Sequence, residues 1–225
     1  MKKQILLIEA IWLLFMLLTS YVCMGKEDSK QTVNEQKSVT EVESTGKVLV
    51  AYFTWPEADG VDASSGASRI ISDGKLYGNT EYVARLIAKE TKGDLFAIQT
   101  EKKYPTPHKA LIDEAKREAE AGERPKITSH IQNMEDYDVV FVGYPNWWYD
   151  MPMVIYSFFD EYDFKGKTVI PFVTHGGSRF SESVETIKNL EKEANVIEGP
   201  SVSGRNVPSA EKSIKNWIEK HGLKK

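Results

Sequence analysis

The stretch of sequence that decides the fold spans residues 139–148 and reads Val-Val-Phe-Val-Gly-Tyr-Pro-Asn-Trp-Trp. Its first four residues are all apolar, which is typical of a strand buried on both faces of a parallel sheet. The apolar run breaks at Gly143, and two adjacent tryptophans, Trp147 and Trp148, follow it. Open α/β sheets bind ligands beyond the carboxyl ends of their strands. Two large flat side chains at that edge therefore indicate a large flat ligand.

On both sides of this stretch, short apolar runs alternate with segments of helical periodicity. This alternation predicts an α/β fold in three layers, with a five-stranded parallel sheet and helices on both faces. Thr106 and Pro107 predict the start of the second helix, with the threonine as its cap. Pro171 lies inside the fourth strand, where we expect a bulge or incomplete pairing because proline cannot donate to the ladder. The predicted strands are 48–53, 94–100, 137–143, 167–174 and 195–197, and the predicted helices are 79–90, 106–119, 153–159, 183–194 and 208–221.

The amino-terminal residues are expected to lie outside this fold. Residues 1–25 hold two lysines, an apolar run interrupted by Glu9, and then small or polar residues, a pattern typical of a secretory signal peptide. An uncleaved membrane anchor is the second interpretation, because 5–24 would span about 30 Å as a helix. Lipidation of Cys23 is the third. All three place the domain at 47–225 outside the cytoplasm, and the polar segment 26–46 is interpreted as a disordered linker.

Composition and charge exclude several classes of function. The 225 residues carry 29 basic and 33 acidic side chains, a net charge of −4, which disfavours nucleic acid as a partner. Cys23 is the only cysteine, so the domain has no disulfide or thiol chemistry. The Lys- and Glu-rich segment 109–123 is interpreted as a solvated helix face. No Walker loop, no Gly-x-Gly-x-x-Gly after the first strand and no metal-binding set of histidines is present; His108, His130 and His221 are interpreted as surface or helix residues.

Two other strand ends carry groups suited to a phosphate and to a closely approaching ligand. Thr54 ends the first strand, and Gly78-Asn79-Thr80 open the helix that follows. Backbone N–H groups at a helix start attract an anion, and hydroxyl and amide groups add donors. The alternative is that Asn79 or Thr80 merely caps the helix. The fourth strand ends in Thr-His-Gly-Gly-Ser at 174–178, where glycines allow a close backbone approach.

Together these three loops resemble the flavodoxin-like family, in particular a bacterial branch whose first strand reads Ala-Tyr-Phe-Ser/Thr-Trp and whose first helix opens Gly-Asn-Thr. The resemblance covers residues 47–223. It implies the strand order 2-1-3-4-5 and FMN at the carboxyl edge of the sheet. On this resemblance, the phosphate is surrounded by Thr54, Trp55, Gly78, Asn79 and Thr80, and the flavin ring lies between Pro145, Asn146, Trp147 and Trp148 on one side and Thr174, His175, Gly176, Gly177 and Ser178 on the other.

The resemblance implies an exported FMN-binding redox protein. Such a protein either passes electrons to a redox partner protein or uses NAD(P)H to reduce a small acceptor such as a quinone. A reductase needs a pocket beside the flavin, which residues 56–77 or 104–125 could build. The alternative is a domain without redox activity that acts as an extracytoplasmic binding module. Related reductases often pair, so a homodimer is one alternative, although the sequence does not fix the oligomeric state. His175 is a candidate proton donor, with a purely backbone role as its alternative.

Two further hypotheses concern single segments. Residues 56–77 separate Trp55 from Gly78, whereas the phosphate motif is continuous in shorter family members. This insertion is either a lid, with Arg69 as a charge partner, or a surface excursion. Of the two adjacent tryptophans, we expect one to face the core and the other to face the ligand.

Overall fold

The computed structural model describes residues 46–56 and 69–225. These belong to one compact unit. The predictions for the signal or anchor at 1–25 and for nearly all of the linker lie outside the described residues. Among the residues described, no helix is both long and apolar enough to cross a membrane.

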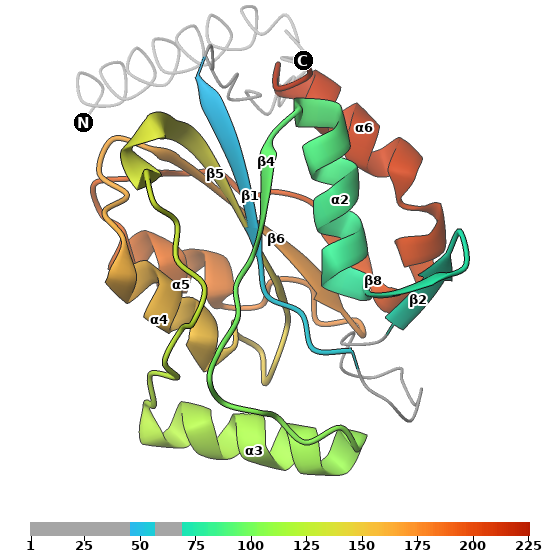
Figure 1. The fold of residues 1–225 in the computed structure, drawn as a ribbon, viewed down its shortest axis with the longest axis vertical. Helices are drawn as coiled ribbons and strands as arrows, with labels where there is room; N and C mark the ends of the chain where they lie inside the picture. Colours follow the sequence, from blue (N-terminus) through green and yellow to red (C-terminus); the bar gives the residue numbers. More distant parts are fainter. Residues whose placement is uncertain (1–45, 57–68) are drawn as a thin grey trace, which may run out of the picture. The chain divides into compact units, whose positions relative to one another are not determined.

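The centre of the domain is a parallel sheet in the order β4-β1-β5-β6-β7, with β8 also paired to β6 (Figure 1). This confirms the predicted order, but the sheet has six strands instead of five because the last position is shared by two short strands. The loop that carries the two adjacent tryptophans is also shorter than predicted. The strand before it, β5, does not end at Gly143 but continues to Pro145. The strands are β1 (Lys47–Tyr52), β4 (Asp94–Ala97), β5 (Tyr137–Pro145), β6 (Thr168–His175), β7 (Asn195–Val196) and β8 (Ser201–Ser203).

Pro171 explains why the last strand is divided. The carbonyls of Val169 and Pro171 accept bonds from Ile197 and Gly199, at 3.0 Å each, so this side of β6 faces the last strand. The missing N–H of the proline points to the same side, and β7 ends before that point while β8 begins after it. The predicted incomplete pairing at Pro171 is therefore confirmed.

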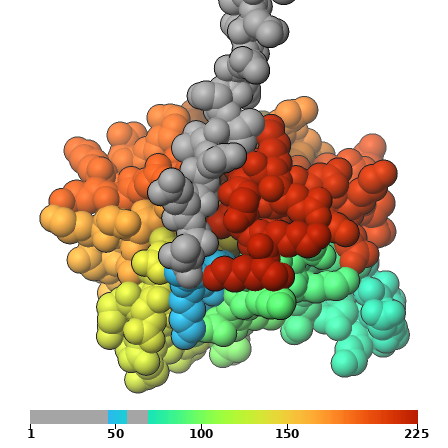
Figure 2. Space-filling model, turned by 90° about the horizontal axis from the view of Figure 1, so that it is seen from above, coloured from blue at the N-terminus to red at the C-terminus, as the bar shows by residue number. Residues whose placement is uncertain are grey.

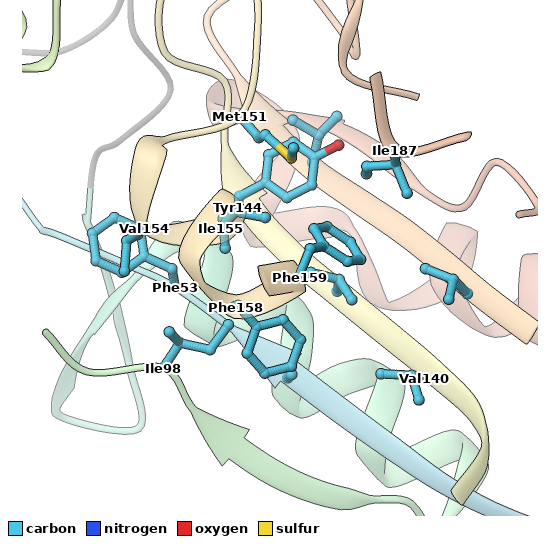
Figure 3. Close-up of a cluster of buried hydrophobic side chains, with 14 of the residues drawn as sticks. Phe53, Ile98, Val140, Tyr144, Met151, Val154, Ile155, Phe158, Phe159 and Ile187 are labelled. Atoms are coloured by element: carbon cyan, nitrogen blue, oxygen red, sulfur yellow. The ribbon is translucent and has the colours of Figure 1, made fainter. Parts of the chain in front are cut away.

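Residues of the central strands alternate between two hydrophobic clusters, one on each face of the sheet. The helices α2 (Asn79–Thr91) and α6 (Glu211–Lys220) cover one face, while α4 (Met153–Glu161) and α5 (Ser183–Leu190) cover the other (Figure 1). Figure 3 shows Phe158 and Phe159 of α4 packed near Val140 of β5. Each such fully buried side chain stabilises the fold by about 1.5–3 kcal/mol.

The amino-terminal end of the sheet is closed by the end of the chain. The carboxyl terminus lies beside the start of β1 and the end of α2 (Figure 2), where the Lys225 amide donates to the Glu90 carbonyl at 3.2 Å. Lys47 also pairs with Asp94 there, at 3.1 Å. Ligand access to the sheet is therefore expected at the opposite, carboxyl edge.

One helix departs from the layered arrangement. Helix α3 (His108–Ala121) lies beyond the carboxyl ends of the strands and does not cover a face of the sheet (Figure 1). The predicted cap is wrong: Pro107 occupies the cap position, and the helix begins one residue later. Leu111, Ala115 and Glu118 form its buried stripe, at the i, i+4, i+7 spacing of a helix that buries one side.

The segment expected to lack secondary structure contains a hairpin. Strands β2 (Arg69–Ser72) and β3 (Lys75–Gly78) pair antiparallel around Asp73 and Gly74, whose φ angles are 51° and 72°. Asp-Gly between apolar residues is a strong signal for a two-residue turn with left-handed backbone, so this hairpin was readable from the sequence. Residues 57–68, which belong to the segment interpreted as either a lid or a surface excursion, lie outside the described part of the chain.

Candidate functional site at the carboxyl edge of the sheet

Hydrogen bonds join the three predicted loops at one edge of the sheet. The Asn146 amide donates to the Thr174 carbonyl at 2.8 Å, which ties the end of β5 to the end of β6. The hydroxyls of Thr80 and Thr174 lie 2.7 Å apart and are fully buried, which ties the start of α2 to β6. The resemblance to known sites placed these loops together, and the geometry does so independently.

The start of α2 presents amide groups that have no partner within the helix. Gly78 occupies the cap position and has no side chain to bond them, so the interpretation of Asn79 or Thr80 as a cap is wrong. A Cβ atom on Gly78 would lie 2.0 Å from the Thr54 hydroxyl oxygen, so only glycine permits this approach. Free amides and hydroxyls at a helix N-terminus form an anion site.

One carboxylate stands near this anion site. Glu81 lies in the first turn of α2, where its charge alone would oppose an anion. Arg85 compensates it with two hydrogen bonds to the same carboxylate oxygen, at 2.8 and 3.0 Å. The bonds to Glu81 also raise the pKa of the arginine. The local charge is thereby neutralised, and the helix N-terminus keeps its positive end.

A cavity of about 430 Å³ opens beside the aromatic loop. It is bounded by the loops that follow β5 and β6 and by α3, and six of the predicted site residues line it. Four residues of α3 and Tyr149 complete the wall, so the interpretation of 109–123 as a solvated face is wrong for its inner side. The lining residues are His108, Leu111, Ile112, Ala115, Asn146, Trp147, Trp148, Tyr149, Gly176, Gly177 and Ser178.

The aromatic wall is a tight turn in an unfavourable conformation. Trp147 and Asp150 exchange two backbone hydrogen bonds, at 2.9 and 3.2 Å, around Trp148 and Tyr149. Both central residues have left-handed backbone, with φ of 51° and 67°. Asparagine and glycine favour such positions and bulky aromatics do not. Strain of this kind is typical of functional sites.

One of the two adjacent tryptophans faces the core, as predicted, and the other is exposed. Trp147 is buried against Phe53, with the ring centroids 5.7 Å apart. Trp148 is 45% exposed and lines the cavity. Its indole N–H donates to the carbonyl of Ile112 at 2.8 Å, which fixes the ring against α3.

Asn146 has a structural task that the sequence did not indicate. Its side-chain amide donates to the carbonyl of Arg179 at 2.9 Å, and its oxygen accepts a bond from the amide of Tyr149 at 3.2 Å. One end of the side chain thus joins the loop after β5 to the loop after β6, and the other end holds the turn of its own loop. Pro145, buried at the end of β5, pairs with Thr174 in register and lies behind the same loop.

His175 is buried at the end of β6, and its Nδ1 atom has no hydrogen-bond partner among the described residues. Burial lowers its pKa, and the nearby positive charge of Arg179 lowers it further. The imidazole is therefore neutral at neutral pH. It does not line the aromatic cavity.

Thr54 and Trp55 border a second cavity, of about 420 Å³, between the ends of β1 and β4. Trp55 packs edge-on against Tyr104, with ring centroids 5.4 Å apart. Residues 104–125 are one of the two segments expected from the sequence to build a pocket beside the flavin, and four residues of α3 line the aromatic cavity. Neither Tyr104 nor the individual lining residues were predicted, because helical periodicity indicates burial but not which surface the helix covers.

The fold and this edge define a flavodoxin-like α/β protein. A family model described as flavodoxin matches residues 69–221, more than half of the chain. The chain therefore belongs to the flavodoxin family, which confirms the resemblance inferred from its loop motifs. A search of curated proteins gives no match.

Solved structures agree with this assignment. A protein assigned as a flavoprotein from Bacteroides eggerthii has 30% identity and a TM-score of 0.61, over 79% of this chain and 99% of its own. A similar protein from Bacteroides uniformis has 29% identity and a TM-score of 0.59, over 78% and 99%. A flavoprotein from Lactobacillus acidophilus, solved in complex with FMN, has 18% identity and a TM-score of 0.53, over 76% and 98%, and supports the fold alone.

Proposed function

We propose that this protein binds FMN at the carboxyl edge of the sheet. The observation that carries the proposal is the junction of an anion site and an aromatic cavity through the buried bond between Thr80 and Thr174. The phosphate would be held by the free amides of α2 and the hydroxyl of Thr54, in the space that Gly78 leaves. The flavin ring would lie against Trp148 and the glycines after β6. A relative of 30% identity is assigned as a flavoprotein, which supports this reading.

Bound FMN supplies hydride and single-electron chemistry, and the protein supplies binding and orientation. Trp148 and the apolar side of α3 line the cavity and would shield one side of the flavin ring from water. The neutral, unpartnered Nδ1 of His175 is a group able to exchange a proton near the end of β6. Among the residues that the structure describes, no Asp, Glu, Lys or Arg side chain lines the aromatic cavity.

The surface of α3 favours a small acceptor over a protein partner. Its exposed charges are paired within the helix: Lys109 with Asp113 at 2.6 Å and Lys116 with Glu120 at 3.6 Å. Docking between electron carriers relies on concentrated charge of one sign. A mixed, paired rim beside an apolar cavity instead suits an uncharged planar acceptor such as a quinone, with NAD(P)H as the electron donor.

The cellular location is part of the same proposal. The lysines and apolar run of residues 1–25 support export, either with cleavage or with a retained tether to the membrane. Fractionation of cells that express the full chain, with an antibody to the domain, tests this part alone. Recovery of all the protein in the cytoplasm would contradict export without affecting the flavin site.

The test of the proposed activity starts with the colour of the purified chain. We expect a yellow protein, or a colourless one that quenches the fluorescence of added FMN. Oxidation of NADH and NADPH is then followed with and without a quinone. Absence of any flavin binding would favour the alternative, a binding module without redox activity. Flavin binding without turnover would favour an electron carrier.

A further inference from the structure

We propose that Tyr104, held by Glu118, is the positioning residue that sets the phosphate anchor and the aromatic wall at the spacing FMN requires. This inference rests on the proposed flavin site. It concerns a residue that does not itself line the aromatic cavity but packs behind Trp147, which does. It follows from three sets of contacts, made by the ring of Tyr104, by its hydroxyl and by Glu118.

The ring of Tyr104 touches both halves of the site from behind. It is 3% exposed, and its centroid lies 5.4 Å from that of Trp55 and 5.3 Å from that of Trp147. Trp55 directly follows Thr54 of the anion site, and Trp147 directly precedes Trp148 of the aromatic wall. Phe53 closes the cluster at 6.0 Å. These edge-on contacts fix how far apart the two halves lie.

The hydroxyl of Tyr104 is held by a buried charge. It donates to Oε2 of Glu118 at 2.9 Å, and Nζ of Lys102 lies 2.5 Å from the other carboxylate oxygen. The side chain of Glu118 is fully buried. Glutamate is almost never fully buried unless it is paired. Apolar residues can replace a buried ion pair without loss of stability, so the pair points to a positional role.

Two members of this cluster keep their protons across the physiological pH range. Burial and the nearby Glu118 raise the pKa of Tyr104, so the phenol remains a hydrogen-bond donor. Burial of Lys102 acts to lower its pKa, but the hydrogen bonds to Glu114 and Glu118 outweigh this effect and raise the pKa overall. The ammonium group of Lys102 therefore stays charged.

Glu118 also connects the aromatic cluster to the outer wall of the cavity. It belongs to the same buried stripe of α3 as Leu111 and Ala115, which line the cavity. The helix is thus held at two points, by Glu118 through Tyr104 and by Ile112 through Trp148. A shift of Tyr104 would move the anchor, the wall and α3 relative to one another.

The test compares Tyr104→Phe with Tyr137→Phe in the full chain. Both variants keep the ring and lose a hydroxyl that donates to a carboxylate, and Tyr137 bonds Asp94 at 2.8 Å near the opposite edge of the sheet. FMN engages both halves of the site at once, whereas riboflavin lacks the phosphate. We expect Tyr104→Phe to weaken FMN about tenfold, as for a lost bond to a charged group. Riboflavin affinity is expected to change less than twofold, and Tyr137→Phe to change neither ligand.

A second variant, Glu118→Gln, keeps an acceptor but removes the charge, and we expect a smaller loss in the same direction. The reduction potential of bound flavin is measured in the two tyrosine variants. It is expected to shift in Tyr104→Phe and to stay unchanged in Tyr137→Phe. Equal weakening of FMN and riboflavin, or equal effects of the two tyrosine variants, would overturn the positioning role and leave the proposed function intact. Failure of the wild-type chain to bind any flavin would overturn both.

Discussion

The two halves of the candidate site are built in different ways. The phosphate anchor consists of residues next to strand and helix ends, and one buried bond between Thr80 and Thr174 holds it to the sheet. The aromatic wall depends on a strained turn at Trp148 and on α3, which precedes it by about 30 residues in the chain. The anchor is therefore set by local sequence, and the wall is set by tertiary packing. Substitutions in the two halves should differ in which ligand they affect.

The largest effect is expected at Gly78, in the anchor. A Cβ atom there would meet the Thr54 hydroxyl at 2.0 Å, so Gly78→Ala forces the start of α2 and Thr54 apart. Overpacking of this kind costs about 1–3 kcal/mol, and FMN affinity should fall about 10- to 100-fold. Fluorescence titration measures the change. Gly122→Asn is the control, because nothing lies within 4 Å of a Cβ there and asparagine tolerates its φ of 61°; an equal loss in the control would contradict the steric account.

The bond between Thr80 and Thr174 should show coupling in a double-mutant cycle. Thr80→Val leaves a buried hydroxyl unpaired, at a cost to the free energy of unfolding of about 1–3 kcal/mol. The double variant with Thr174→Val should be more stable than the two single costs imply, but it should still bind FMN about tenfold more weakly. Urea unfolding and FMN titration report the two quantities separately. Additive unfolding energies would show that the bond does not join the two loops.

A substitution in the aromatic wall should leave the ratio of the affinities for FMN and riboflavin unchanged. Trp148→Phe keeps an aromatic ring but loses the bond to the Ile112 carbonyl, worth about 1 kcal/mol. FMN and riboflavin should weaken by the same factor, about fivefold. Trp217→Phe is the matched control, since Trp217 lies on α6 and its ring stacks on His221. A loss confined to FMN would contradict the division between anchor and wall.

The smallest effect is expected from pH. The pKa of His175 is lowered by burial, so at acidic pH the unfolded chain binds a proton that the folded chain does not. The free energy of unfolding should therefore rise with pH. It should fall as the pH drops through about 6.5, the pKa of histidine in the unfolded chain. Urea midpoints at pH 5.5 and 7.5 measure this slope, and His175→Gln should flatten it while His221→Gln does not. An unchanged slope in His175→Gln would place the titration elsewhere.

The same contrast explains what the sequence could predict. The alternation of strands and helices and the incomplete pairing at Pro171 follow from local patterns, because apolar runs and turn residues act over a few positions. The order of the strands and the meeting of the three loops came from the resemblance to the flavodoxin-like family. The position of α3 does not, since its buried stripe would serve equally well on a face of the sheet. Tyr104 and the structural use of Asn146 were missed for the same reason. The Asp73-Gly74 hairpin was predictable, and only the expectation of a featureless insertion obscured it.

The most direct test of the central claim is the affinity of the full chain for FMN compared with riboflavin. Both ligands carry the same ring, so they share the aromatic wall, and only FMN can use the amides of α2. Fluorescence quenching at constant ionic strength gives both dissociation constants. We predict that FMN binds at least tenfold more tightly than riboflavin. Equal affinities, or no binding of either ligand, would contradict the account.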